Sequence, residues 1–126
     1  MIHLDTNILI ALAKDEPTSK DWLSQLMIAG EEFRVSSIAW YEFLIGPVHP
    51  SQIRDIEFIL NSAPIPFTAK LASQAAKYFN LTGRSRKRKT DTLIATTALM
   101  NGGILATRNV EDFEVFEPLG LELIKV

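Results

Sequence analysis

Hydrophobic and polar residues follow two different periods along the chain. Short apolar runs typical of buried strands open the chain at IHLD, return at FRVSS and GILAT, and close it at LELIKV. The segments between these runs carry apolar residues at every third or fourth position, which is the spacing of an amphipathic helix. Strands that alternate with helices form a parallel sheet covered on both faces. The pattern therefore predicts one α/β domain over residues 1–126.

Proline, glycine and capping residues set the expected limits of the helices. After the first strand, NILIALAK continues with a helical pattern. A second helix starts at Pro17 and ends near Gly30, and SIAWYEFLIG forms a third that Gly46 and Pro47 close. Further helices are expected over residues 50–63, 68–83 and 90–100. PIPF is too rich in proline for anything but a short edge strand, and NVEDF predicts a short turn or helix.

The composition restricts the chemistry that the protein can use. Apolar residues make up 47% and charged residues 22%, which is ordinary for a globular domain. No apolar stretch is long enough to span a bilayer, and the chain does not start like an export signal. The absence of cysteine excludes disulfides, thiolate nucleophiles and Cys-based zinc sites, and we expect a cytoplasmic protein. Neither His3 nor His49 has a metal-binding partner at HExxH spacing, and His3 is expected to be a packed structural residue.

The net charge of −2 hides a compact basic segment. RSRKRK carries five positive charges, whereas the rest of the chain has eight Lys or Arg against 15 Asp or Glu. The cluster consists of Arg84, Arg86, Lys87, Arg88 and Lys89. Such a cluster either holds the phosphates of a nucleic acid or forms the solvated end of a loop, and the sequence leaves both interpretations open.

Asp5 follows directly after the first expected strand. It can cap the helix that begins with Thr6 and Asn7, and capping alone would explain a polar residue there. In a parallel α/β sheet, however, ligands collect beyond the carboxyl ends of the strands. Asp5 is therefore either a helix cap or one acid of a site at that edge.

Two further acids interrupt apolar helix faces. Glu42 lies within IAWYEFLI, so its helix is expected to be apolar on nearly every side. An unpaired buried carboxylate costs several kcal/mol, so Glu42 should be neutral, paired or bound to a cation, the alternative being a narrow solvent stripe. Asp91 lies in the first turn of the helix over residues 90–100, where a helix N-terminus favours an anion. It shares a face with Ile94 and Ala98, however, so its side chain should point toward the sheet.

A further polar pair follows the GILAT strand. Asn109 and Asp112 come just past its end, at the edge where Asp5 should lie. Singly, Asn109 could cap the short helix and Asp112 could be a surface residue. Carboxylates gathered at one edge raise one another's pKa, and a divalent cation removes that repulsion. Oxygen ligands without Cys or paired His select Mg²⁺ or Mn²⁺, the ions used in phosphodiester hydrolysis.

Four segments together resemble the acidic blocks of the PIN-domain ribonucleases. They are LDTNIL, SSIAWYEFLIG with Glu42, KTDTLIATTA with Asp91, and ATRNVEDF. Their order and spacing are most similar to the VapC-type toxins of toxin–antitoxin pairs, over nearly the whole chain. The resemblance implies a three-layer α/β/α fold around a parallel sheet of four to five strands. It also implies an endoribonuclease with one or two Mg²⁺ or Mn²⁺ ions that leaves 5′-phosphate and 3′-hydroxyl ends.

The resemblance assigns roles to individual residues. Asp5, Glu42 and Asp91 match the three central metal-site acids. Many relatives carry an acid where this chain has Asn109, so either Asn109, through its amide oxygen, or Asp112 would complete the site. Thr6 and Thr107 match hydroxyl residues that lie beside the acids. Arg108, between Thr107 and Asn109, either binds phosphate or neutralises a local acid.

As a toxin, the protein would have an RNA substrate and an antitoxin that silences it. Helices near the N-terminus would offer apolar grooves for that antitoxin and for a homodimer contact. The alternative is a PIN-fold RNA-binding or RNA-processing protein that is not a toxin or cleaves weakly. A haloacid dehalogenase-like phosphatase fits less well, because it needs a second aspartate where this chain has Asn7.

Overall fold

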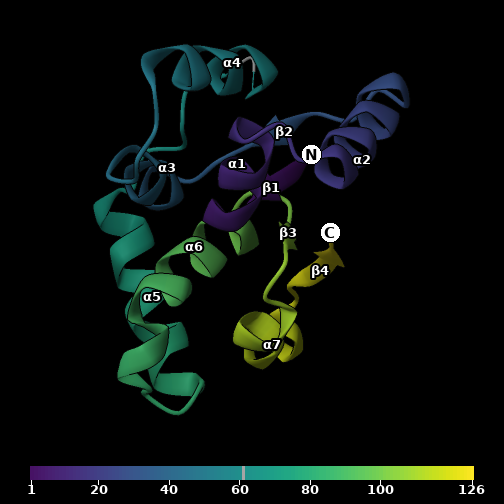
Figure 1. Ribbon diagram of the computed structural model, residues 1–126. Helices are drawn as coiled ribbons and strands as arrows, with labels where there is room; N and C mark the ends of the chain where they lie inside the picture. Colours follow the sequence, from purple (N-terminus) through teal and green to yellow (C-terminus); the bar gives the residue numbers. More distant parts are fainter. Residues whose placement is uncertain (61) are drawn as a thin grey trace.

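Four parallel strands form the sheet at the centre of the molecule (Figure 1). The computed structural model describes residues 1–60 and 62–126. Within these ranges the strand order is β2-β1-β3-β4, with the bounds Phe33–Arg34, Ile2–Leu4, Ile104–Thr107 and Glu122–Lys125 respectively. His3 of β1 pairs with Arg34 of β2 on one side and with Leu105 of β3 on the other. The parallel α/β fold expected from the alternating pattern is confirmed.

The helices begin and end close to their expected bounds. They are α1 (Thr6–Ala13), α2 (Pro17–Ile28), α3 (Ser37–Leu44), α4 (Pro50–Leu60), α5 (Ala69–Leu81), α6 (Lys89–Leu99) and α7 (Val110–Phe113). Two short 3₁₀ helices, η1 (Arg86–Arg88) and η2 (Glu114–Leu119), precede α6 and follow α7. Residue 61, which belongs to the helix expected over residues 50–63, lies outside the described residues. Within the described ranges, none of the helices is long and apolar enough to cross a membrane.

The PIPF segment forms less sheet than expected. Ile65 makes an isolated parallel bridge with Ser36. Its N–H donates to the carbonyl oxygen of Val35 at 2.8 Å, and its carbonyl oxygen accepts the N–H of Ser37 at 3.0 Å. Pro64 and Pro66 on either side have no N–H to donate, so the bridge cannot extend into a ladder.

Both faces of the sheet are covered, because all three residues of β1 are buried although their side chains alternate between the faces. The helices α1 and α6 both contact β3, and α5 packs along α6 (Figure 1). Leu105 and Ala106 of β3 are fully buried, and one apolar cluster joins them to Ile8 of α1 and Phe43 of α3. The sheet and the first helices therefore share a single apolar core.

The carboxyl ends of β1 and β3 meet at one edge of the sheet. Asp5, the residue after β1, donates its backbone N–H to the carbonyl oxygen of Ala106 at 3.0 Å. Its side chain caps α1, as Ser36 caps α3 and Thr68 caps α5. The chain therefore turns from strand to helix at Asp5 and brings the start of α1 to the end of β3.

His3 is packed inside the sheet, as expected, with 2% of its surface exposed. Its Nε2 donates to the carbonyl oxygen of Asn101, at a distance of 2.7 Å. Burial lowers the pKa of His3 below its ordinary value of 6.5, against the effect of the Asn101 bond, and the Arg34 charge lowers it further. The folded protein therefore holds His3 neutral at a pH where the unfolded chain takes up a proton.

We predict that the contribution of His3 to the free energy of unfolding is lost as the pH drops below about 6.5, because the unfolded chain gains a proton on His3 there and the folded protein does not. Other titrating groups are common to the two proteins compared below, so the difference between their profiles belongs to His3. Denaturant unfolding between pH 5 and 8 measures it, with His3→Gln as the comparison, since a Gln amide can still donate to Asn101. Parallel stability profiles for the two proteins would contradict the prediction.

Candidate active site

Thr6 connects two of the predicted site acids. Its backbone N–H donates to Asp5 Oδ1 at 2.8 Å, and its hydroxyl donates to Glu42 Oε1 at 2.7 Å. Asp5 ends β1, Thr6 begins α1 and Glu42 lies on α3. Asp5 can therefore both cap α1 and belong to a site, because the next residue, Thr6, donates its hydroxyl to Glu42.

A second hydroxyl holds Asp5 from the neighbouring strand. Thr107, the last residue of β3, donates its hydroxyl proton to Asp5 Oδ2 at 2.7 Å. Burial raises the pKa of Asp5, and the hydrogen bonds from Thr107 and Thr6 oppose that rise. The negative charges of Glu42 and Asp112 raise it further. Each oxygen of Asp5 thus accepts one hydrogen bond in an acidic surrounding.

Asp91 adds a third acid, from the first turn of α6. Its pKa is raised to about 6, first by burial and then by the negative charges of Asp5, Asp112 and Glu42, while Arg88 lowers it. Charges act on one another in this way only over short distances. Asp91 therefore shares one electrostatic environment with three acids from other parts of the sequence.

The two candidates for the last position lie after β3. Asp112, on α7, is exposed, and its charge raises the pKa of both Asp5 and Asp91. Asn109 stands at the N-cap position of α7, but its side chain makes no capping hydrogen bond. Its backbone N–H instead donates to Thr107 Oγ1 at 3.0 Å. Which of the two side chains completes a metal site stays a prediction.

The donor chemistry of this edge fits a hard dication. The groups that meet there are carboxylate, hydroxyl and amide oxygens, and a dication would relieve the repulsion that raises the pKa of Asp91 to about 6. Among the described residues, no three His, Asp or Glu side chains already lie close enough together to hold a metal ion between them. The acids therefore share one edge and one electrostatic environment without forming a finished cage.

The helix α3 is apolar in composition, as expected, but part of its apolar surface is open to solvent. Tyr41 and Leu44 on α3 and Ile45 directly after it are 61%, 41% and 66% exposed. Glu42 itself is half-buried, on the side of α3 that faces Thr6.

The basic segment lies immediately before Asp91 in the chain. Arg84, Arg86, Lys87 and Lys89 are exposed, and none of them forms an ion pair within the described residues. Arg88 is half-buried, its carbonyl oxygen accepts the hydroxyl of Thr92 at 2.6 Å, and its charge lowers the pKa of Asp91. The cluster thus borders the acidic edge through Arg88 and projects its other cations into solvent.

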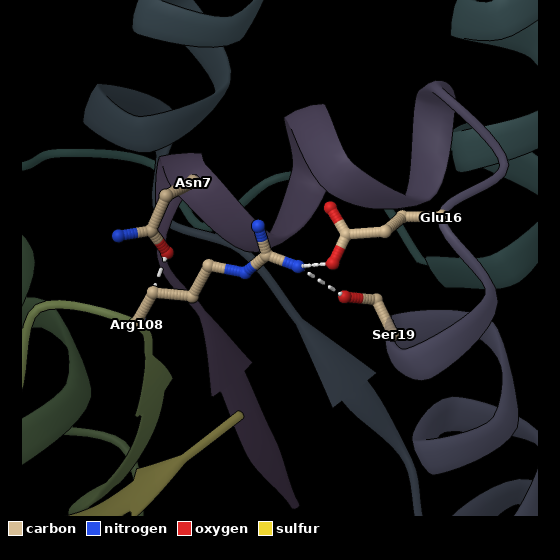
Figure 2. Close-up of polar contacts among 4 residues, drawn as sticks. All are labelled: Asn7, Glu16, Ser19 and Arg108. Carbon is tan, nitrogen blue, oxygen red and sulfur yellow. Dashed lines mark hydrogen bonds and ion pairs between the residues drawn. The ribbon is translucent and has the colours of Figure 1, made fainter.

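Arg108 is engaged by residues that the sequence did not single out (Figure 2). Its guanidinium forms an ion pair with Glu16 and donates to Ser19 Oγ at 2.9 Å. Its backbone N–H donates to Asn7 Oδ1 at 3.3 Å. Arg108 therefore neutralises an acid that is close in space, and whether it also binds phosphate stays a prediction. No local sequence signal could identify Glu16, because the two residues are 92 positions apart.

Comparison with known proteins gives the family. The sequence model described as "PIN domain" matches residues 2–116, so the chain belongs to the PIN-domain family. Among curated relatives, Ribonuclease VapC10 of Mycobacterium tuberculosis is 33% identical over 122 residues, covering 94% of this chain and 90% of the relative. Ribonuclease VapC19 of the same organism is 28% identical over 120 residues, covering 92% and 94%. The resemblance to VapC-type proteins is confirmed.

Solved structures show the same fold at low identity. VapBC2 from Rickettsia felis, bound to a DNA fragment from its promoter, has a chain that matches with a TM-score of 0.71 and 24% identity. That match covers 99% of this chain and 100% of the other. FitAcB from Neisseria gonorrhoeae matches with a TM-score of 0.68 and 20% identity, covering 99% and 97%. These likenesses support the arrangement of the sheet and helices.

We predict that Asp91→Asn stabilises the metal-free protein at neutral pH. The folded protein binds a proton on Asp91 between about pH 4 and 6 that the unfolded chain does not bind, so ionisation of Asp91 lowers the free energy of unfolding as pH rises through that range. Removing the charge should therefore raise stability at pH 7.5 by about 1 kcal/mol, allowing for solvent screening of a half-buried group. Thermal unfolding in a chelator measures the difference.

The gain should fade below about pH 4, where Asp91 is protonated in both states. Asp21→Asn, which removes an exposed acid on α2, is the matched control and should leave the midpoint unchanged. An equal gain from both substitutions would mean that net charge, rather than the surroundings of Asp91, is responsible.

Proposed function

We propose that the protein is a metal-dependent endoribonuclease and the toxin of a VapBC-type pair. The observation that carries the proposal is the hydrogen-bond network in which Thr6 connects Asp5 with Glu42 and Thr107 donates to Asp5. The charges of Asp5, Glu42 and Asp112 also raise the pKa of Asp91, which supports a shared acidic site. The names of the curated relatives, Ribonuclease VapC10 and VapC19, support RNA as the substrate class. The chain has no cysteine nucleophile, which accords with hydrolysis by water.

One or two Mg²⁺ or Mn²⁺ ions would be held by Asp5, Asp91 and Glu42, with Asp112 or Asn109 as the further ligand. A bound ion of this kind lowers the pKa of a water molecule and stabilises the charge on a leaving oxygen. Thr6 and Thr107 orient the carboxylates by donating to Glu42 and Asp5. The hydroxyl bonds to Asp5 and Glu42 leave lone pairs on both carboxylates for a cation.

The basic cluster would hold the RNA backbone beside the acids. Its four exposed cations have no acidic partner among the described residues, so their charge is available to phosphate. An acidic edge repels a polyanion, and cations next to it offset that repulsion. The contact is with the backbone, so it would add affinity for any sequence.

An antitoxin segment would bind between α2 and α4. A groove of about 340 Å³ lies there, lined in part by Leu23, Met27, Phe58 and Ile59. Phe58 is 83% exposed, which is unusual for a large apolar side chain without a partner. Solved neighbours of the fold include toxin–antitoxin complexes such as VapBC2. The exposed side chains of Tyr41 and Leu44 on α3, and of Ile45 directly after it, would suit a homodimer contact.

We predict that the protein cleaves RNA with Mn²⁺ or Mg²⁺, and that Asp5→Asn abolishes cleavage. The substitution removes a charged ligand but keeps an acceptor for Thr6 N–H, so the fold and the RNA affinity should be retained. Purified protein is incubated with total RNA in Mn²⁺ or in a chelator, and RNA binding is measured in parallel. The rate should fall by a factor on the order of 100 or more.

Asp21→Asn is the matched control, and it should cleave like the original protein. An undiminished rate in Asp5→Asn with metal supplied would refute the assignment of Asp5. RNA binding by the unsubstituted protein without cleavage, in either metal, would favour the non-catalytic alternative.

We predict that neutralising the basic cluster flattens the salt dependence of RNA binding. Replacing Arg84, Arg86, Lys87, Arg88 and Lys89 with Gln removes up to five phosphate contacts. The slope of log K against log salt should then become shallower by about 3, at roughly 0.7 per contact with a single strand. Binding titrations over roughly 50 to 300 mM salt measure this slope.

A charge-matched control removes five lysines elsewhere, namely Lys14, Lys20, Lys70, Lys77 and Lys125. Because both variants change the net charge equally, a larger change of slope in the cluster variant identifies the contact surface. Equal slopes in the two variants would show that the basic cluster does not contact the RNA.

A further inference from the structure

The hydroxyl of Thr107 is held by two N–H donors as well as by Asp5. The side-chain Nδ2 of Asn7 donates to Thr107 Oγ1 at 3.4 Å, and the backbone N–H of Asn109 donates at 3.0 Å. A hydroxyl has two lone pairs and one proton. With both lone pairs occupied by donors, the proton is directed to Asp5 Oδ2, 2.7 Å away. Because Thr107 is fully buried, water does not compete for these bonds.

The amide of Asn7 is fixed in the orientation that this arrangement needs. Its Oδ1 accepts the backbone N–H of Arg108 at 3.3 Å (Figure 2), and its Nδ2 donates to the hydroxyl oxygen of Thr107. A flipped amide would place an NH₂ group against the N–H of Arg108 and lose that bond. The network around Arg108 therefore determines which end of Asn7 reaches the hydroxyl.

Arg108 is in turn anchored to the start of α2. Its guanidinium spans from the end of β3 to Glu16 and to Ser19, whose side chain is fully buried (Figure 2). This anchor fixes the backbone of Arg108 against the first turn of α1, where Asn7 lies. The network thus runs from the start of α2 through β3 and α1 to an acid of the candidate active site.

We propose that Asn7 is a positioning residue that acts on Asp5 through the hydroxyl of Thr107, with the Arg108–Glu16 pair as its anchor. This inference rests on the proposed function, because the role of Asp5 as a metal ligand is part of that proposal. In this role Asn7 contacts neither a metal nor RNA. It orients the hydroxyl of Thr107, which in turn orients Asp5. Direct hydrogen-bond partners of metal ligands commonly change metal affinity or activity by about 10- to 100-fold when they are removed. Thr107 is such a partner of Asp5, and Asn7 acts through it.

A double-mutant cycle tests the coupling. Asn7→Leu removes the amide at similar size, Thr107→Val removes the hydroxyl at equal size, and the third variant carries both. Each protein is measured by calorimetric titration with Mn²⁺ alone and by RNA cleavage with kcat and KM separated. Each single substitution should weaken Mn²⁺ binding and lower kcat by about tenfold, with KM changed less than twofold. The double variant should be no worse than Thr107→Val, since Asn7 acts through that hydroxyl.

Two controls separate positioning from loss of structure. Thr107→Ser retains the hydroxyl, so its Mn²⁺ affinity should lie within about threefold of that of the original protein. Thr97→Val makes the same substitution at another buried threonine, whose hydroxyl donates only within α6, and should leave Mn²⁺ affinity unchanged. If Asn7→Leu fails to unfold cooperatively, Asn7→Ser removes the same long amide without adding apolar bulk.

The inference is overturned alone if the original protein binds Mn²⁺ and cleaves RNA while Asn7→Leu does both equally well. It is also overturned if the effects of the Asn7 and Thr107 substitutions multiply in the double variant, because independent effects contradict action through the hydroxyl. If the original protein neither binds Mn²⁺ nor cleaves RNA, the proposed function fails first and the inference fails with it.

Discussion

The parallel pairing of β1 with β3 is the constraint on which the candidate active site depends. These strands come from opposite ends of the chain, and their alignment places Asp5 and Thr107 at the same edge of the sheet. The helix that starts at this edge, α1, packs against α3, and α3 packs against α6. Glu42 and Asp91 therefore reach the edge by helix packing, whereas Asp5 reaches it through the register of the sheet.

The gathering of acids opposes the stability that the rest of the fold provides. Burial and mutual repulsion raise the pKa of Asp91 to about 6, so at neutral pH the site holds charge that the surrounding structure does not favour. The positive charge of half-buried Arg88 offsets part of this repulsion and lowers the pKa of Asp91. Functional sites commonly lower the stability of a fold in this way, because charges arranged to bind a ligand repel one another when the ligand is absent.

Features encoded by neighbouring residues could be predicted from the sequence. Strand and helix limits followed from caps, prolines and glycines, and the inward direction of Asp91 followed from the apolar stripe that it shares with Ile94. Asp5 could be placed at one edge with the segment that holds Asn109 and Asp112, because parallel strands have a common direction. The place of Thr107 beside the acids was predicted only by the family resemblance. PIPF was overestimated as a strand because two prolines interrupt its hydrogen bonding.

Features that depend on contacts between distant segments were not predictable in this way. The exposure of Tyr41 and Ile45 depends on which side of α3 the rest of the chain covers, and composition does not contain that information. Glu16, Ser19 and Asn7 were not singled out as partners of Arg108, since no local pattern connects an ion pair that spans 92 positions. Whether Asn109 or Asp112 completes the site depends on a side-chain orientation past a short helix, which the sequence leaves open.

The wide separation of β1 and β3 has a consequence for the order of events during translation. Thr107 is made 102 positions after Asp5, so the central strand pair can close only after β3 has been synthesised. A nascent chain that stops before β3 lacks both Thr107, which donates to Asp5, and Asp112. The candidate site therefore stays incomplete until β3 and the residues directly after it have been made, however early its first acids leave the ribosome.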